Sequence, residues 1–256
     1  MSQCTTCLGR LLITSQKLKD IVYQLLDDSL NGRFWNTKDA VKASEIIAGY
    51  IKKSELRWLN YTNEYFYDIR FEDAAGPLLR NVIGILPGKS DKNEVVIFSA
   101  HYDHLGKERI EASQHAYRYL ISGNTKDTIY NCANDNASGV AALLTIAAYF
   151  SKKGPQERTI LFAAFSREES GMVGSKLYAE DLEPSIIVAN INLEMLGRPD
   201  TKKSKPFITG ADLSDLRSIL NNGLFSAAGI EKYFQRESPS VTLFRRSDNI
   251  SFALRG

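Results

Sequence analysis

Cysteine, histidine and long apolar runs are all scarce in this sequence. The three cysteines, Cys4, Cys7 and Cys132, are an odd number, which argues against a disulfide framework. Cys4 and Cys7 form a CxxC pair, but a zinc ribbon needs a second such pair and the sequence has none, so we interpret the pair as incidental. No run of about 18 apolar residues occurs, so we expect no transmembrane segment.

Excess charge and a visible targeting segment are absent as well. The chain has 32 Lys and Arg residues against 30 Asp and Glu residues, a net charge of +2. This balance gives no reason to expect a nucleic acid or another polyanion as a partner. The N-terminal stretch lacks the apolar core of a signal peptide, so the protein is either cytoplasmic or has lost a leader. The sequence leaves the compartment open.

The first part of the chain has a helical pattern. Apolar residues recur at helical spacing over residues 15–30 and predict an amphipathic helix. A second helix is predicted over residues 37–53, with Thr37 as its N-cap. The polar and aromatic segment 54–78 is interpreted as an irregular or β-ribbon connector.

From residue 79 the pattern changes to short apolar runs that predict strands, at residues 79–88, 94–100, 159–165 and 186–193. Continuous runs of this kind fit central strands that are covered on both faces. Helices are predicted over residues 138–153 and 212–229. The alternation predicts an α/β fold, a three-layer sandwich in which a mostly parallel or mixed sheet lies between helices. We expect one domain over residues 1–256, with residues 1–78 as its helical N-terminal portion.

Polar side chains follow three of the four predicted strands, as His101 and Asp103 after 94–100, Glu168 and Glu169 after 159–165, and Glu194 after 186–193. In open α/β sheets, ligands bind at the carboxyl ends of the strands. Asp135 precedes the helix at 138–153, which places it at the same edge if that helix runs antiparallel to the strands. We therefore expect these side chains to converge.

A bound dication would make such a group of carboxylates favourable, because uncompensated like charges in one cleft force protonation. Neutral imidazole with carboxylates is a normal zinc ligand set. Two metal ions about 3.5–4 Å apart can share a bridging carboxylate. Each motif alone has an ordinary structural explanation, such as a surface histidine, a capped turn or a solvated Glu-Glu pair. Their joint placement at one edge favours a metal site.

Four sequence blocks resemble metallopeptidase family 28, zinc exopeptidases of the leucyl aminopeptidase and glutamate carboxypeptidase type. The blocks are VVIFSAHYDHLG (95–106), IYNCANDNASGVAALLTIA (129–147), RTILFAAFSREESGMVGSKLYAE (158–180) and ANINLEMLGRP (189–199). Their order and spacing are specific, and the resemblance covers about residues 24–256. On these blocks the chain is identified as a member of the family. Membership implies peptide hydrolysis with two zinc ions and peptide substrates with a free N-terminus.

The resemblance also implies a role for each site residue. The implied metal ligands are His101 and Glu194 for the first zinc, Glu169 for the second, and Asp135 as the bridge between the two. Glu168 resembles the general base, which takes a proton from the attacking water and passes it to the leaving amine. Asp103 resembles the carboxylate that orients the His101 imidazole. Many relatives have Asp at the position of Glu194, and Glu has a longer side chain that carries the same carboxylate ligand.

One ligand of the family pattern, a histidine of the second zinc near the C-terminal end, has no counterpart here. No histidine follows His115. Residues 247–256 resemble the block that precedes that histidine, with Asn249 where some relatives have His. We interpret the chain as a C-terminally truncated member, without the last strand and closing helix. We hypothesise that it binds the second zinc weakly and has little or no peptidase activity.

The remaining candidate residues and functions receive plainer interpretations. We expect His104 to lie behind the metal ligands or on the surface, His115 to be solvated and Cys132 to pack as a small buried hydrophobe.

A glutaminyl cyclase, which shares the fold but holds a single zinc, is the alternative enzyme, and the complete Asp-Asn-Ala-Ser-Gly block disfavours it. A non-catalytic domain is the other alternative, and the surviving site residues argue against it. The sequence does not distinguish an aminopeptidase from a carboxypeptidase, and it leaves the substrate side-chain preference and the oligomeric state open. Many relatives of the family are secreted or periplasmic.

Overall fold

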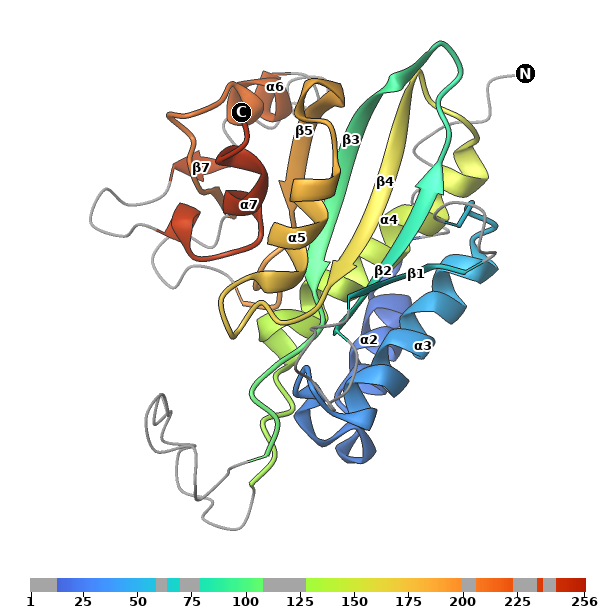
Figure 1. The fold of residues 1–256 in the computed structure, drawn as a ribbon, viewed down its shortest axis with the longest axis vertical. Coiled ribbons are helices and arrows are strands. Elements are labelled where there is room, and N and C mark those ends of the chain that lie inside the picture. Colours follow the sequence, from blue (N-terminus) through green and yellow to red (C-terminus); the bar gives the residue numbers. More distant parts are fainter. Residues whose placement is uncertain are drawn as a thin grey trace.

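A mixed five-stranded sheet forms the centre of the protein in a computed structural model, which describes residues 13–58, 64–69, 79–107, 128–198, 206–222, 234–236 and 243–256. The strand order is β1-β2-β4-β3-β5. The strands are β1 (Phe66–Ile69), β2 (Leu79–Leu86), β3 (Asp91–His101), β4 (Arg158–Phe165) and β5 (Ile187–Asn192). Strand β3 runs parallel to β4 and β5, whereas β2 runs antiparallel to β4 and β1. The expected mixed sheet is confirmed (Figure 1).

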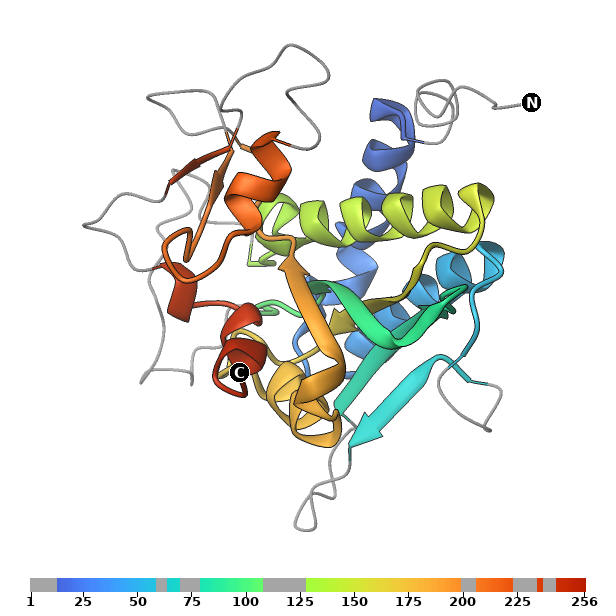
Figure 2. The ribbon, with the colours of Figure 1, turned by 90° about the horizontal axis from the view of Figure 1, so that it is seen from above.

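Helices cover both faces of this sheet, which confirms the three-layer sandwich (Figure 2). One face carries α2 (Ser15–Leu25), α3 (Lys38–Lys53) and α4 (Ser138–Lys153), and the other carries α5 (Val173–Asp181) and α7 (Asn249–Ala253). Beyond β5 lie the short α6 (Leu216–Leu220) and a ribbon of β6 (Phe207–Ile208) and β7 (Gln235–Arg236). In the described part of the chain, no helix combines the length and the apolar character needed to cross a bilayer.

The continuous apolar runs are explained by two cores, one on each face of the sheet. Side chains alternate between the faces along a strand. In β4, Phe162 and Ala164 pack against the layer of α2, α3 and α4, while Leu161 and Phe165 pack against α5 and α7. Both sets of side chains must therefore be apolar, so the strand has no polar alternation.

Local signals place the first two helices. Thr37 begins α3 as predicted, because its hydroxyl accepts the Ala40 N–H at 3.2 Å. The helix predicted over 15–30 is too long, since α2 ends at Leu25. The carboxylate of Asp27 accepts the Ser29 N–H at 2.9 Å and starts a 3-10 turn, Asp28–Arg33, in place of a further α-helical turn.

Two other predictions from the apolar pattern need correction. Strand β5 is an edge strand and not a central one, because it pairs only with β3 among the described strands and leaves Val188 47% exposed. The helix predicted over 212–229 is α-helical only over Leu216–Leu220 where the structure describes it, and residues 223–233 lie outside the described ranges. The connector predicted over 54–78 contains β1. Cys4, Cys7 and His115 also lie outside the described ranges.

Candidate metal centre

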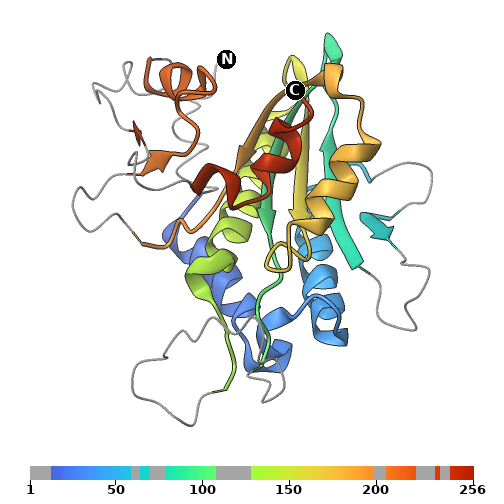
Figure 3. The ribbon, with the colours of Figure 1, turned by 60° about the vertical axis from the view of Figure 1, so that its left-hand side comes forward.

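Four elements bring the predicted site residues to one edge of the sheet. His101 is the last residue of β3, Glu168 lies three residues after the end of β4, and Glu194 lies two residues after the end of β5. Because these strands are parallel, their carboxyl ends meet at the same edge (Figure 3). Asp135 reaches this edge from the turn Ala133–Ala137, which leads into α4, and its peptide bond to Asn136 is cis.

The imidazole of His101 is the centre of the first ligand group. Its Nε2 atom lies 3.1 Å from Oδ1 of Asp135 and 3.1 Å from Oε1 of Glu194, and the side chain is 1% exposed. Zinc binds N and O ligands at about 2.0–2.2 Å, so two ligands of a tetrahedral ion lie roughly 3.3 Å apart. The spacing of these three side chains therefore fits one zinc ion. Oε2 of Glu168 lies 4.0 Å from the same Nε2 atom.

Glu194 is held in place by two residues that the sequence analysis did not assign to the site. The Ser247 hydroxyl donates to Oε2 of Glu194 at 2.7 Å and accepts from the Asn192 amide at 2.7 Å. The Asn136 amide donates to the Leu193 carbonyl at 2.9 Å and lies 3.5 Å from Oε2 of Glu194. Neither residue has a local sequence signal for this role, because each contact joins segments more than 50 residues apart.

Asp103 contacts both His101 and Glu168. Nδ1 of His101 lies 3.2 Å from the Asp103 backbone carbonyl and 3.7 Å from its carboxylate Oδ1. That same Oδ1 accepts the Glu168 N–H at 3.0 Å. The backbone of Asp103 therefore makes the closer contact with the imidazole, while its fully buried carboxylate fixes the loop that carries Glu168.

A second group of potential ligands consists of His104, Asp135 and Glu169, whose ligand atoms lie within 4.8 Å of one another. His104 is 6% exposed, and its Nδ1 atom contacts Oε1 of Glu169. The expected surface position of His104 is therefore wrong, whereas the alternative position behind the ligands stays a prediction. The chain turns after β3, where the His104 N–H donates to the Arg33 carbonyl at 3.2 Å, and the imidazole reaches Glu169.

The protonation equilibria of the site show that it favours a positive charge. Burial alone would lower the pKa of His101, but the carboxylates of Glu194, Asp103 and Asp135 outweigh it and raise the pKa well above its usual range. Burial raises the pKa of Glu168 to about 9. Burial likewise raises the pKa of Asp248 to about 7. This arrangement suits a cation, because a bound metal ion stabilises the ionised form of carboxylates that burial otherwise keeps protonated.

Cys132 lies next to the turn Ala133–Ala137 but is in none of the potential ligand groups found among the described residues. It is partly buried, and burial raises the pKa of its thiol to about 12. A neutral thiol is a poor metal ligand, because the thiolate is the form that binds metal.

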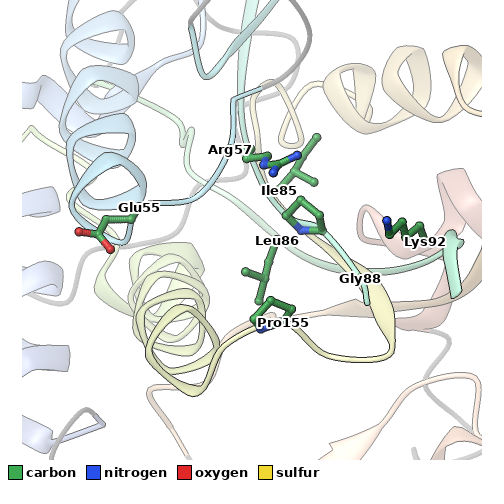
Figure 4. Close-up of a pocket in the computed structure, with 8 residues that line it drawn as sticks. Glu55, Arg57, Ile85, Leu86, Gly88, Lys92 and Pro155 are labelled. Atoms are coloured by element: carbon green, nitrogen blue, oxygen red, sulfur yellow. The ribbon is translucent and has the colours of Figure 1, made fainter. Parts of the chain in front are cut away.

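A hollow at the opposite edge of the sheet has a different character (Figure 4). Its lining residues are Glu55, Arg57, Ile85, Leu86, Pro87, Gly88, Lys92 and Pro155. It lies at the end of β2, which is antiparallel to β4 and therefore finishes away from His101. Among the described residues that line it there is one carboxylate and no histidine, so these residues offer no metal-ligand set.

A three-layer α/β sandwich with histidine and carboxylate groups gathered at the ends of its parallel strands is the arrangement expected of an α/β protein that binds a metal ion at this edge. The model of peptidase family M28 matches residues 81–256. The chain belongs to this family. The match includes every predicted site residue from His101 to Glu194, whereas α2 and α3 precede it.

Curated relatives are similar over part of the chain. A protein described as a probable zinc metalloprotease from Phaeosphaeria nodorum is 33% identical over 121 residues, which cover 46% of this chain and 24% of that protein. Aminopeptidase YwaD from Bacillus subtilis is 30% identical over 137 residues, which cover 52% of this chain and 25% of that protein. The similar region thus spans about a quarter of these relatives.

Solved structures share the fold over nearly the whole chain. A leucine aminopeptidase precursor from Bacteroides thetaiotaomicron superposes with a TM-score of 0.68 and 21% identity, covering 94% of this chain and 81% of that one. A glutaminyl cyclase from the same organism, bound to N-acetylhistamine, gives a TM-score of 0.68 and 21% identity, covering 94% and 80%. The fold therefore does not distinguish these two activities.

Proposed function

We propose that this protein is a zinc-dependent aminopeptidase that releases N-terminal residues from peptides. The observation that carries the proposal is the position of Glu168 beside a zinc-type ligand group. His101, Asp135 and Glu194 are spaced for one ion, and the Glu168 carboxylate lies 4.0 Å from the shared imidazole. The similarity to proteins named as aminopeptidases supports the same reaction.

The ligand groups fit zinc by their chemistry. Each combines one imidazole with carboxylates, and two buried atoms of the second group, Nδ1 of His104 and Oε1 of Glu169, have no hydrogen-bond partner among the described residues. When bound, zinc would act as a Lewis acid that polarises a carbonyl and lowers the pKa of bound water toward neutral pH. His101, Asp135 and Glu194 would hold the first ion, and Asp135 would be shared with a second.

Glu168 has the position of a general base. Its side chain is 11% exposed, and its backbone is fixed by the hydrogen bond to Asp103. In the proposed reaction it takes the proton of the attacking water and delivers it to the leaving amine, so one carboxylate serves both transfers. Asp103 acts through Glu168 and His101, because its contacts with both residues hold them in position relative to each other.

The proposed number of zinc ions is two, with Glu169 as a ligand of the second. If Asp135 and Glu169 were its only protein ligands, the second ion would be held more weakly than the first. A two-metal site favours the peptidase over a cyclase that uses a single zinc. The free amino group of a peptide substrate suits this acidic site, which favours an aminopeptidase.

The test compares two reactions of the purified 256-residue chain loaded with zinc. Release of p-nitroaniline from leucyl-p-nitroanilide reports peptidase activity, and cyclisation of an N-terminal glutaminyl peptide reports the alternative. We expect leucyl hydrolysis that falls about 10²–10⁴-fold in kcat for Glu168→Gln, with zinc content unchanged. Cyclisation without hydrolysis would establish the cyclase. Zinc binding without either reaction would be expected if the histidine of the family pattern is required for activity, or if the domain is non-catalytic.

A further inference from the structure

The imidazole of His104, expected behind the metal ligands or on the surface, has an unusual environment for a histidine. It is 6% exposed, and its Nδ1 atom faces Oε1 of Glu169. Although these two atoms touch, their geometry is not that of a hydrogen bond, and neither has a hydrogen-bond partner among the residues the structure describes. Their contact is an ion pair only if the imidazole is protonated, and a bound cation would take the place of that proton between the two atoms.

The same pair of atoms belongs to a ligand group. His104, Asp135 and Glu169 present one N and two O atoms within 4.8 Å of one another. The group has the same composition as that of His101, Asp135 and Glu194, and the two groups share Asp135. Two metal sites joined by a bridging carboxylate have this arrangement.

The surrounding backbone keeps His104 in this position. Its N–H donates to the Arg33 carbonyl at 3.2 Å, and the Arg33 guanidinium donates to the Tyr102 carbonyl at 2.8 Å. Arg33 therefore holds the chain on both sides of Asp103 as it leaves β3. This long-range anchor directs the imidazole inward, toward Glu169.

We propose that His104 is a direct ligand of the second zinc ion, through Nδ1, together with Glu169 and the bridging Asp135. The inference rests on the proposed two-metal function and adds a ligand to it. It replaces the hypothesis that only Asp135 and Glu169 hold this ion. The second ion would then have one imidazole and two carboxylates, as the first has.

Metal binding by the purified 256-residue chain tests the assignment without relying on catalysis. After removal of metal with a chelator, zinc content is measured by elemental analysis, and Co²⁺ titration is followed by visible absorption. We expect two ions per chain in the wild type. In His104→Asn, which keeps an amide near the position of Nδ1, we expect a second-site affinity more than about 100-fold lower, because even residues that only support a ligand change affinity 10–100-fold.

The chain contains three histidines, and the other two supply controls. His101→Asn should weaken the first ion, and His115→Asn should leave both affinities unchanged. The metal-free His104→Asn variant also loses the contact between Nδ1 and Glu169, so urea unfolding of the metal-free variant is measured first to show that it still folds cooperatively. This measurement separates a ligand from a residue needed only for folding.

The possible outcomes separate this inference from the function on which it rests. Two ions bound equally tightly by the wild type and His104→Asn would overturn the assignment of His104 while the two-metal function stands. Loss of the second ion in His115→Asn but not in His104→Asn would also overturn it. A wild type that binds no zinc would overturn the proposed function itself.

Discussion

The backbone N–H of Glu168 donates a hydrogen bond to Oδ1 of Asp103 at 3.0 Å. Asp103 follows β3 and Glu168 follows β4, so this bond joins the loops at the ends of two adjacent parallel strands. The same carboxylate lies 3.7 Å from the imidazole of His101. One buried side chain thus fixes the distance between Glu168, the proposed base, and His101, the proposed metal ligand.

Substitution of Asp103 by Asn tests this link. Asn retains an acceptor for the Glu168 N–H but removes the negative charge beside His101. We expect zinc affinity and kcat for leucyl-p-nitroanilide each to fall about 10–100-fold, as for other residues that orient metal ligands. Metal titration and steady-state kinetics measure the two effects. Unchanged affinity would show that only the backbone carbonyl orients the imidazole.

Ser247 is expected to support Glu194 in the same way. In Ser247→Ala, Oε2 of Glu194 loses the hydroxyl that donates to it at 2.7 Å. We expect about a tenfold loss of affinity for the first zinc, with the second affected less. Ser185→Ala is the matched control, because Ser185 makes a similar bond to the exposed Glu183 carboxylate and should leave metal binding unchanged. Equal effects of the two substitutions would refute the role of Ser247.

Two glycines in helices should respond oppositely to alanine. A Cβ atom on Gly139 would overlap the Leu193 carbonyl and the Asn136 side chain, so Gly139→Ala should destabilise the fold by about 1–3 kcal/mol and displace the metal-binding turn. Gly49 lies within α3 with nothing within 4 Å of its added Cβ, so Gly49→Ala should stabilise by about 0.5–1 kcal/mol. Urea unfolding of both variants measures the two free energies of unfolding, and a stabilising Gly139→Ala would contradict the close packing.

Arg33 is expected to be important for stability. Its guanidinium is 1% exposed and donates to the carbonyls of Leu25, Tyr102 (2.8 Å) and Asn131 (2.9 Å). Arg33→Met leaves these carbonyls without their donor, and each buried acceptor costs about 1–3 kcal/mol. We therefore expect a loss of more than about 3 kcal/mol in the free energy of unfolding, measured by urea titration of the metal-free chain.

Arg158→Met is the control for Arg33. Arg158 forms an ion pair with Glu94, and both side chains are largely exposed. Surface pairs of this kind contribute about 0–1 kcal/mol, so the change in unfolding free energy should be small. If both arginine variants lost the same stability, the buried guanidinium would have no special role.

The sequence by itself determined the fold class and most of the first ligand group. Apolar runs predicted β2, β3 and β4, because a strand buried on both faces cannot alternate with polar residues. Thr37 predicted the start of α3, since an N-cap is a local interaction. His101 ends a strand and Glu168 and Glu194 follow strands, so their arrival at one edge could be inferred from strand direction.

Only the tertiary structure decided which side chains face each other at that edge. Ser247 is 53 positions from Glu194 in sequence, and no local pattern links a serine before a short helix to a carboxylate after a strand. The place of β5 at the edge of the described sheet likewise depends on pairing between distant segments. His104 turns inward because its backbone is bound to Arg33, 71 positions before it in sequence. Residue types and their spacing thus determined which side chains could bind a metal ion. Contacts between distant segments determined which other side chains each of them faces.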